Sequence, residues 1–267
     1  MGWRAFPDHH RRILFFWSQK SACTTLFRLI ADNMARPPEA KQWFVLHSVP
    51  LPMARDLIER HGFRSVILVR HPASRMVSAF LNKFVVHYGQ PIPRHGAMEP
   101  FARDLHADIC AHAGRRPGPN CSTFEEFLAA VARLHATRPD PWARLDGHWD
   151  TQAPPRLAET GFRYDHILRV ETMDADLARV APELGLIWRP TALNRTDYAP
   201  GETDAYLGRT PAQRLLALPY RPGNFLNTLN LSLIRAVHAG DYRLFGYGFR
   251  PGDPVADPAA GPAGAAA

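Results

Sequence analysis

A cation and several hydroxyl groups follow a short apolar segment near the start of the chain. Residues 13–17 (ILFFW) are wholly apolar, as in a buried parallel strand, and a helical pattern begins at residue 23. A loop between a strand and a helix presents unpaired backbone N–H groups and the positive end of the helix dipole to an anion. The small Ala22 lets the backbone approach a phosphate closely. The candidate phosphate-binding residues are Lys20, Ser21, Ala22, Cys23, Thr24 and Thr25.

This loop differs from the common phosphate-binding loop of ATPases. It lacks the pattern G-x-x-x-x-G-K-[ST], and no acidic residue clearly ends a strand where it could hold magnesium. Phosphate binding without these groups argues against ordinary ATP hydrolysis. The alternative interpretation is an ordinary strand–helix turn with a solvated lysine.

A second candidate anion ligand follows another apolar segment. Arg70 comes directly after residues 66–69 (VILV), and Ser78 lies eight residues further along a predicted helix. Eight residues are about two helical turns, so Ser78 returns to the same helix face. The planar, permanently charged guanidinium of Arg70 suits a phosphate. The alternative is a structural arginine and a serine on a helix surface.

Two histidines are candidates for a general base. His47 would end a strand over residues 43–46, at the sheet edge where α/β proteins bind their ligands. His148 lies in the segment Asp146-Gly147-His148-Trp149. An imidazole has its pKa near neutral pH, which suits proton abstraction. We rank His47 first and His148 second; for either, the alternative is a half-buried structural histidine.

Apolar runs and helical periodicity alternate along the chain. Strands are predicted at 13–17, 43–46, 66–69 and 166–170, and helices at 23–30, 52–61, 72–86, 123–136, 173–184 and 224–237. This order predicts an α/β fold with a central parallel sheet flanked by helices. Residues 1–249 are predicted to form a single domain. Residues 88–121, rich in Pro, Gly, Arg and His, resemble an inserted loop or lid, and residues 250–267 a disordered tail.

Composition gives coarser expectations. The formal net charge of +7 predicts an anionic partner. Three cysteines form no disulfide framework, which suits a reducing compartment, and no apolar segment is long enough for a signal peptide or a membrane span. We therefore expect a cytoplasmic protein. His106, Cys110 and His112 could bind zinc together with Cys121, but their spacing is looser than that of known zinc sites, and we expect no metal.

Several segments resemble one known family. Residues 70–84 (RHPASRMVSAFLNKF) resemble the 3′-phosphate motif of the Golgi-type carbohydrate sulfotransferases of sulfotransferase family 2, and residues 20–25 are similar to their 5′-phosphosulfate loop. Residues 146–152 resemble the D-x-H-W-x-x-Q segment of that family. Weaker similarities at 164–171 and 241–247 extend the resemblance over about residues 13 to 247.

The resemblance implies a P-loop-like sulfotransferase fold and a specific chemistry. Such an enzyme transfers the sulfuryl group of 3′-phosphoadenosine 5′-phosphosulfate (PAPS) to a hydroxyl of a carbohydrate or glycoconjugate. Lys20 would offset charge on the leaving oxygen, and Arg70 and Ser78 would hold the 3′-phosphate. Cytosolic sulfotransferases also resemble this chain in placing a catalytic histidine after the strand that precedes the arginine motif, where His47 lies.

The chain also departs from the family pattern. The family usually has proline before the loop lysine, where this chain has Gln19. Its luminal members carry a membrane anchor and paired cysteines, which are not evident in this sequence. We therefore expect a soluble, bacterial-type member.

Two other classes of function are weighed against this interpretation. A small-molecule kinase of related P-loop architecture is disfavoured by the absent ATPase pattern and by the pair of Arg70 and Ser78. A non-enzymatic polyanion binder lacks a recognition motif. We expect a carbohydrate or glycoconjugate acceptor, which the basic segment 88–121 would attract if it is acidic. No nucleic-acid partner is expected, and membrane contact would be peripheral, if the acceptor is a glycolipid.

Overall fold

A five-stranded sheet occupies one half of the molecule. The computed structural model describes residues 3–190 and 203–256. The strand order is β3–β1–β2–β4–β7, and the strands are β1 (Arg4–Asp8), β2 (Ile13–Trp17), β3 (Val49–Pro50), β4 (Arg64–Val69) and β7 (His166–Arg169). Strands β2, β4 and β7 pair in parallel, whereas β1 is antiparallel to both of its neighbours. Four of the five strands therefore run in one direction.

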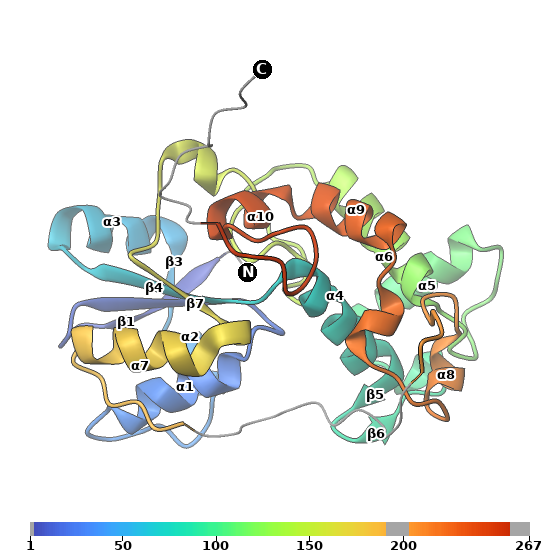
Figure 1. The fold of residues 1–267 in the computed structure, drawn as a ribbon, viewed down its shortest axis with the longest axis horizontal. Helices are drawn as coiled ribbons and strands as arrows, with labels where there is room; N and C mark the ends of the chain where they lie inside the picture. Colours follow the sequence, from blue (N-terminus) through green and yellow to red (C-terminus); the bar gives the residue numbers. More distant parts are fainter. Residues whose placement is uncertain (1–2, 191–202, 257–267) are drawn as a thin grey trace.

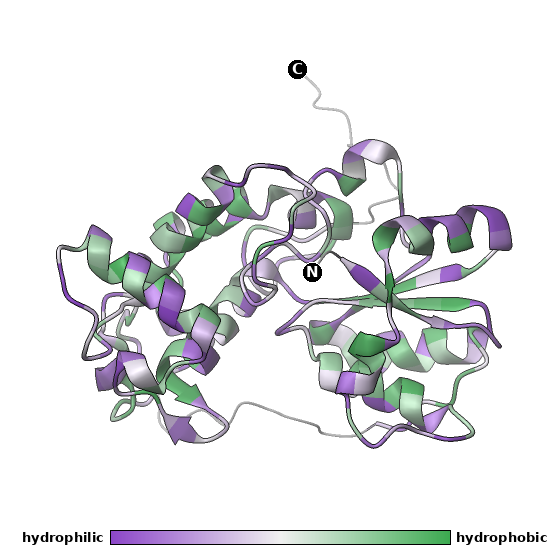
Figure 2. Ribbon diagram, turned by 180° about the vertical axis from the view of Figure 1, so that it is seen from behind, coloured by the Kyte–Doolittle hydropathy of each residue, from purple (hydrophilic) through white to green (hydrophobic). Residues whose placement is uncertain are grey.

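Helices cover both faces of this sheet (Figure 1). Because side chains alternate along a strand, Phe15 and Val66 join the core on one face, and Leu14 and Ile67 join the core on the other. The first face packs against α1 (Cys23–Asp32), α2 (Gln42–Leu46) and α7 (Met173–Glu183). The second face packs against α3 (Leu51–His61) and α4 (Pro72–Phe80). The run of apolar residues along the central strands is visible in Figure 2.

The other half of the molecule is mostly helical, and α4 extends into it from the end of β4 (Figure 1). Its further helices are α5 (Pro100–His112), α6 (Phe124–Ala136), α8 (Ala212–Leu215), α9 (Thr228–Val237) and α10 (Ala239–Phe245). A π-helical turn at Leu81–Val85 continues α4, and the hairpin of β5 (Val86–His87) and β6 (Gln90–Pro91) follows it. Short 3₁₀ turns lie at His95–Ala97, Leu157–Thr160, Val170–Thr172 and Pro222–Phe225.

The structure confirms the predicted fold class and most of its elements. Strands over 13–17, 66–69 and 166–169 are present, and each predicted helix has a counterpart within a few residues. Thr123 caps α6 through reciprocal hydrogen bonds with Glu126, a capping box. The short strand β1 was not predicted. The central sheet is thus mostly parallel and flanked by helices.

The predicted strand at 43–46 is wrong, because these residues belong to helix α2. Phe44 is buried, with its ring stacked on Phe27 of α1 at 5.0 Å between centroids, whereas Leu46 is 70% exposed. Four consecutive apolar residues fit a buried strand and a short helix equally well.

Two further regions differ from the sequence-based prediction. Residues 88–121 contain the 13-residue helix α5, whose residues Leu105 and Ile109 are buried in the protein core. Part of the predicted disordered tail is ordered, since the backbone N–H of Ala256 donates to the carbonyl of Gly246. The remainder of that prediction concerns residues 257–267, which lie outside the described residues. In the described part of the chain, no helix is long and apolar enough to cross a bilayer.

Candidate active site

The loop between β2 and α1 has an unusual backbone. Lys20 and Ala22 adopt positive φ angles of 67° and 51°, a region that residues other than glycine rarely occupy. Each such residue costs about 1–3 kcal/mol and persists where the surrounding structure requires it. A left-handed residue followed by a right-handed helix turns successive N–H groups toward one point and forms a concavity for an anion. The loop backbone is therefore shaped to receive an anion.

The side chain of Gln152 joins this loop to Arg70. Its Oε1 accepts hydrogen bonds from the hydroxyl of Ser21 at 2.9 Å and from the backbone N–H of Arg70 at 2.8 Å. Its Nε2 donates to the carbonyl of Arg70 at 2.9 Å. Ser18 also donates to Oε1 at 3.3 Å. The Ser21 hydroxyl is thus bonded within the protein, and one amide fixes the loop against the end of β4.

Arg70 follows a buried parallel strand, as the sequence predicted. Arg70 follows β4, which is the parallel neighbour of β2, and its Nη1 is 3.4 Å from the carbonyl oxygen of Lys20. Ser78 is buried in α4, two turns further along. The loop and Arg70 therefore meet at the carboxyl edge of the sheet, where parallel sheets place their ligands.

Further cations surround Lys20. Burial, followed by the charges of Lys83 and Arg70, lowers the pKa of Lys20 to about 8. Lys83 lies in the π-helical turn and is 5% exposed; its ammonium bonds to the carboxylate of Glu99 and is 3.5 Å from Nδ1 of His87. Lys20, Lys83 and Arg70 bring three positive charges to this half-buried site, and Glu99 pairs directly with one of them, Lys83. The site therefore has an excess of positive charge. Such a site attracts an anion.

The remaining loop residues line the start of α1. Cys23 begins the helix, and burial raises the pKa of its thiol, so it is not an activated nucleophile at neutral pH. Thr24 is partly exposed, and Thr25 is buried. The backbone N–H of Thr25 donates to the carbonyl of Ala22 at 2.9 Å, which closes the first turn of the helix.

His148 lies beside this cluster. Its Nδ1 is 2.7 Å from Oδ1 of Asp146, and its ring stacks on Phe101 with 4.8 Å between centroids. Burial lowers the pKa of His148; the Asp146 carboxylate opposes this, while Lys83 and Lys20 act in the same direction as burial. The imidazole is therefore neutral at neutral pH, the form that can accept a proton.

His47 has a different setting from the one expected. It follows helix α2 instead of ending a strand, and its ring is exposed. Its Nδ1 is 2.8 Å from the carbonyl oxygen of Trp43, and the two rings stack at 4.0 Å. The argument that favoured His47, namely its expected place at the end of a strand, is therefore wrong. His148, by contrast, lies near enough to Lys20 for the lysine charge to lower its pKa.

Comparison with known proteins decides which family this site belongs to. The model of the sulfotransferase family matches residues 3–248, nearly the whole described chain. The chain belongs to the sulfotransferase family.

A curated relative of this sulfotransferase-family protein is carbohydrate sulfotransferase 11 of Rattus norvegicus. The two are 23% identical over 205 residues, which are 71% of this chain and 56% of the relative. The chain thus spans little more than half the length of the relative that it matches. No solved structure matches the chain.

Sequence reasoning missed several residues of this sulfotransferase-family site. Lys83 lies within the motif at residues 70–84, but no role was predicted for it from the sequence. Glu99 and Phe101 lie in the segment predicted to be irregular, so nothing connected them with Lys83. Gln152 also stood within a quoted motif, but only the structure shows which groups its amide joins. A periodic pattern predicts elements, not the contacts between them.

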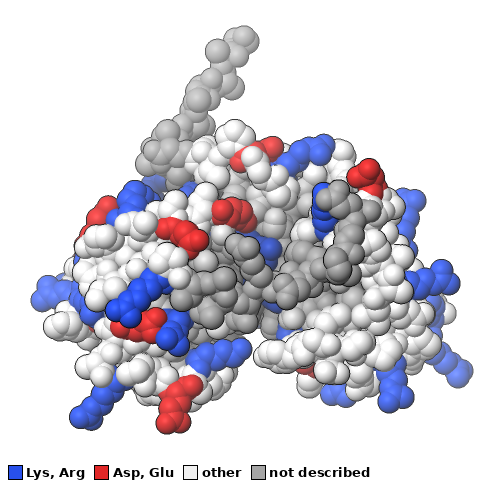
Figure 3. Space-filling model, turned by 60° about the horizontal axis from the view of Figure 1, so that its bottom comes forward, with Lys and Arg blue, Asp and Glu red and all other residues white. Residues whose placement is uncertain are grey.

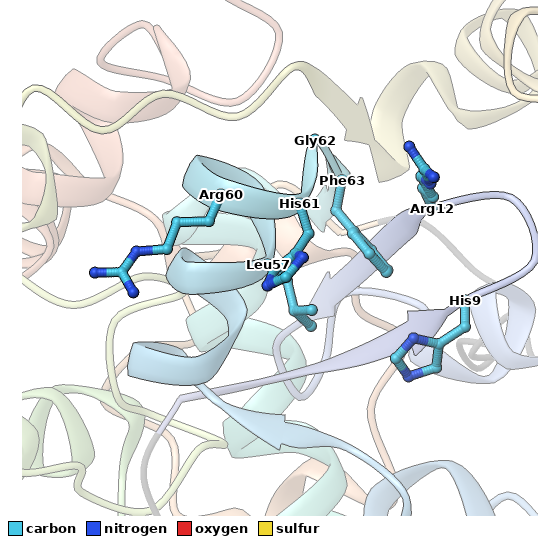
Figure 4. Close-up of a pocket in the computed structure, with 7 residues that line it drawn as sticks. All are labelled: His9, Arg12, Leu57, Arg60, His61, Gly62 and Phe63. Atoms are coloured by element: carbon cyan, nitrogen blue, oxygen red, sulfur yellow. The ribbon is translucent and has the colours of Figure 1, made fainter.

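Two other clusters lie away from this site. A hollow of about 620 Å³ adjoins the end of α3 and the turn before β2 (Figure 4); it is lined by His9, Arg12, Leu57, Arg60, His61, Gly62 and Phe63. Because Arg12 and Phe63 directly precede β2 and β4, the hollow lies at the opposite edge of the sheet. In the candidate zinc segment, Nδ1 of His106 is 3.0 Å from Nδ1 of His95. Within residues 3–190 and 203–256, no three His, Cys, Asp or Glu side chains form a potential metal site.

Proposed function

We propose that this protein transfers the sulfuryl group of PAPS to a hydroxyl of a carbohydrate or glycoconjugate. The observation that carries the proposal is the link made by Gln152 between the strained Lys20 loop and Arg70. A donor with phosphates at two ends needs two anion sites at a fixed separation. Family membership supports sulfotransfer in general, and these two sites support PAPS as the donor.

The residues at the site fit such a donor. Lys20 and the backbone of the β2–α1 loop would bind the 5′-phosphosulfate, and Arg70 and Ser78 would bind the 3′-phosphate that distinguishes PAPS from ATP. The excess of positive charge around Lys20 favours an anionic ligand, whose negative charge would also raise the pKa of that lysine. PAPS supplies an activated sulfuryl group.

The proposed reaction is an in-line displacement at sulfur. The acceptor oxygen forms a bond to sulfur while the bond from sulfur to the bridging phosphate oxygen breaks. The proton of the acceptor hydroxyl passes to Nε2 of His148, and the ammonium of Lys20 offsets the charge on the departing phosphate oxygen. We place His148 ahead of His47 as the base, because Asp146 orients its ring and Lys20 is among the charges that act on it.

The proposed carbohydrate acceptor follows from a relative of the chain. The curated relative is named a carbohydrate sulfotransferase. On the face shown in Figure 3, Lys and Arg side chains lie scattered around the rim and form no single basic patch. The three cysteines are free thiols, which supports the proposed cytoplasmic location.

Thermal stabilisation by nucleotides tests the donor. The protein should be stabilised more by 3′,5′-ADP than by ATP with magnesium, since only the former carries a 3′-phosphate. The reverse preference would support the small-molecule kinase and reject the sulfotransferase. An acceptor screen with ³⁵S-labelled PAPS then tests transfer to a panel of neutral and acidic oligosaccharides and glycosides. No labelled product with any sugar would reject the proposed carbohydrate acceptor.

A further inference from the structure

Arg75 is a wholly buried arginine that no step of the proposed reaction uses. Its side chain is 0% exposed, and its partners are three backbone carbonyl oxygens. Nε donates to Gln19 at 3.0 Å, and Nη2 donates to Gly147 at 2.9 Å and to Asp150 at 2.6 Å. Burying a guanidinium away from water is costly, and the same burial lowers the pKa of Arg75 to about 10. A neutral side chain would fill this space at lower cost.

The partners of Arg75 come from two separate segments of the site. Gln19 directly precedes Lys20, whose positive φ angle makes the backbone orientation there dependent on its surroundings. Gly147 directly precedes His148. One planar guanidinium therefore contacts the peptide before the lysine and the peptide before the histidine at once.

The side chain of Gln19 makes a second connection between the same segments. Its Oε1 accepts a hydrogen bond from Nη2 of Arg144 at 2.8 Å. The same oxygen would lie 2.0 Å from a Cβ atom at Gly147, so only glycine lets the Gln19 amide occupy this position. Gly147 does not have the left-handed φ angle that would itself require glycine. The glycine is thus explained by the close approach of Gln19.

We infer that Arg75 and Gln19 are positioning residues, which hold Lys20 and His148 at a fixed separation on the two sides of the reacting sulfur. The inference rests on the proposed function, since it concerns the geometry of that reaction. An in-line displacement needs the base and the leaving-group cation on opposite sides of sulfur, and a shift of about 1 Å can cost about a hundredfold in rate. Two independent connections between the same pair of segments restrict that shift.

Gly147→Ala tests the inference with a single methyl group. The new Cβ would displace the Gln19 amide, and with it the end of the Arg144 side chain to which that amide bonds, without straining the backbone. We expect at least a tenfold loss of sulfuryl transfer to the best acceptor found in the oligosaccharide screen. The affinity for 3′,5′-ADP and the slow release of sulfate to water without acceptor should stay within about twofold, because neither needs His148 in place. The control is Gly96→Ala, where an added Cβ has no atom within 4 Å.

A double variant separates positioning from general damage. Gln19→Ala removes the two closest atoms that the new Cβ would meet, and only Nη2 of Arg144, at the end of a flexible side chain 2.6 Å away, would still have to move. Gln19→Ala with Gly147→Ala should therefore recover most of the transfer rate of Gln19→Ala alone. Gln19→Ala by itself should lower the ratio of transfer to sulfate release several-fold, and it serves as the deciding variant if Gly147→Ala does not fold.

Three outcomes would overturn the inference. Gly147→Ala could transfer sulfuryl groups at the wild-type rate, or it could lose transfer and 3′,5′-ADP affinity to the same extent. Alternatively, Gln19→Ala could leave the ratio of transfer to sulfate release unchanged. Failure of the wild-type protein to transfer label to any sugar would instead reject the proposed function.

Discussion

Asp146 accepts a hydrogen bond from Nδ1 of His148, with 2.7 Å between the two atoms. A carboxylate can only accept, so the ring proton of the neutral imidazole lies on Nδ1 and Nε2 carries the free electron pair. The same carboxylate also accepts from the backbone N–H of His148 at 2.9 Å, which fixes its own orientation. This pair holds the histidine in the tautomer that a general base requires.

His148→Ala should reduce sulfuryl transfer about a hundredfold or more, while the affinity for 3′,5′-ADP stays near that of the wild type. The imidazole acts on the acceptor only, so donor binding does not depend on it. Steady-state transfer and calorimetric binding measure the two effects. His47→Ala is the matched control and should retain most activity. If the losses fall on His47→Ala instead, His47 is the base and our preference is wrong.

The pH dependence of transfer should report His148. Transfer needs the neutral imidazole, so the rate should fall as pH decreases through its pKa. Burial, Lys83 and Lys20 lower that pKa, which puts the fall below about 6.5, the usual value for histidine. Asp146→Asn removes the carboxylate that raises the pKa, so the fall should move to lower pH and the plateau rate should decrease. A fall that moves to higher pH would contradict the assigned role of Asp146.

The pH dependence of kcat/KM for PAPS should also show a decline at alkaline pH, caused by Lys20. Its pKa of about 8 means that the free enzyme loses this positive charge above about pH 8, so kcat/KM for PAPS should decline there. Lys20→Arg keeps its charge at high pH and should lack this decline. Lys20→Ala should lose about a hundredfold in turnover while 3′,5′-ADP affinity falls much less. An unchanged turnover would remove Lys20 from the mechanism.

Arg70→Ala should raise the KM for PAPS and reduce the preference for 3′,5′-ADP over 5′-AMP as an inhibitor. The guanidinium is proposed to pair with the 3′-phosphate, which only the first of these nucleotides carries. Ser78→Ala should have the same effect to a smaller degree. Inhibition constants for both nucleotides provide the comparison. An equal weakening of both would make Arg70 a residue of the fold and not of recognition.

The protein should become less stable in mild acid. Burial, followed by the charges of His95 and Arg115, lowers the pKa of His106 in the folded state to about 4. The unfolded chain binds a proton at about pH 6.5, so this stability is complete above that pH and is lost as the pH falls toward 4. The slope from one group is at most about 1.4 kcal/mol per pH unit. His106→Leu should flatten the pH dependence of the urea midpoint, and an unchanged dependence would contradict the assignment.

The sequence predicted what depends on local pattern. The apolar segment at 13–17 and the hydroxyl-rich loop after it identified the anion site, and Arg70 followed because parallel strands end at one edge. The helix at 42–46 could not be predicted from four apolar residues, whose burial depends on contact with Phe27. The pairing of Lys83 with Glu99 depends on how the π-helical turn meets the start of α5, which no local pattern encodes.

The π-helical turn at Leu81–Val85 has a consequence for insertions and deletions in this family. The N–H of Val86 bonds to the carbonyl of Leu81, so this turn holds one residue more than an α-helical turn would. Each residue of an α-helix turns the chain by about 100°. Removing one residue before Lys83 in this turn would rotate Lys83, together with the buried Phe84 and Val85, by about 100° relative to α4. A relative that lacks this extra residue should therefore supply the cation beside its loop lysine from another segment.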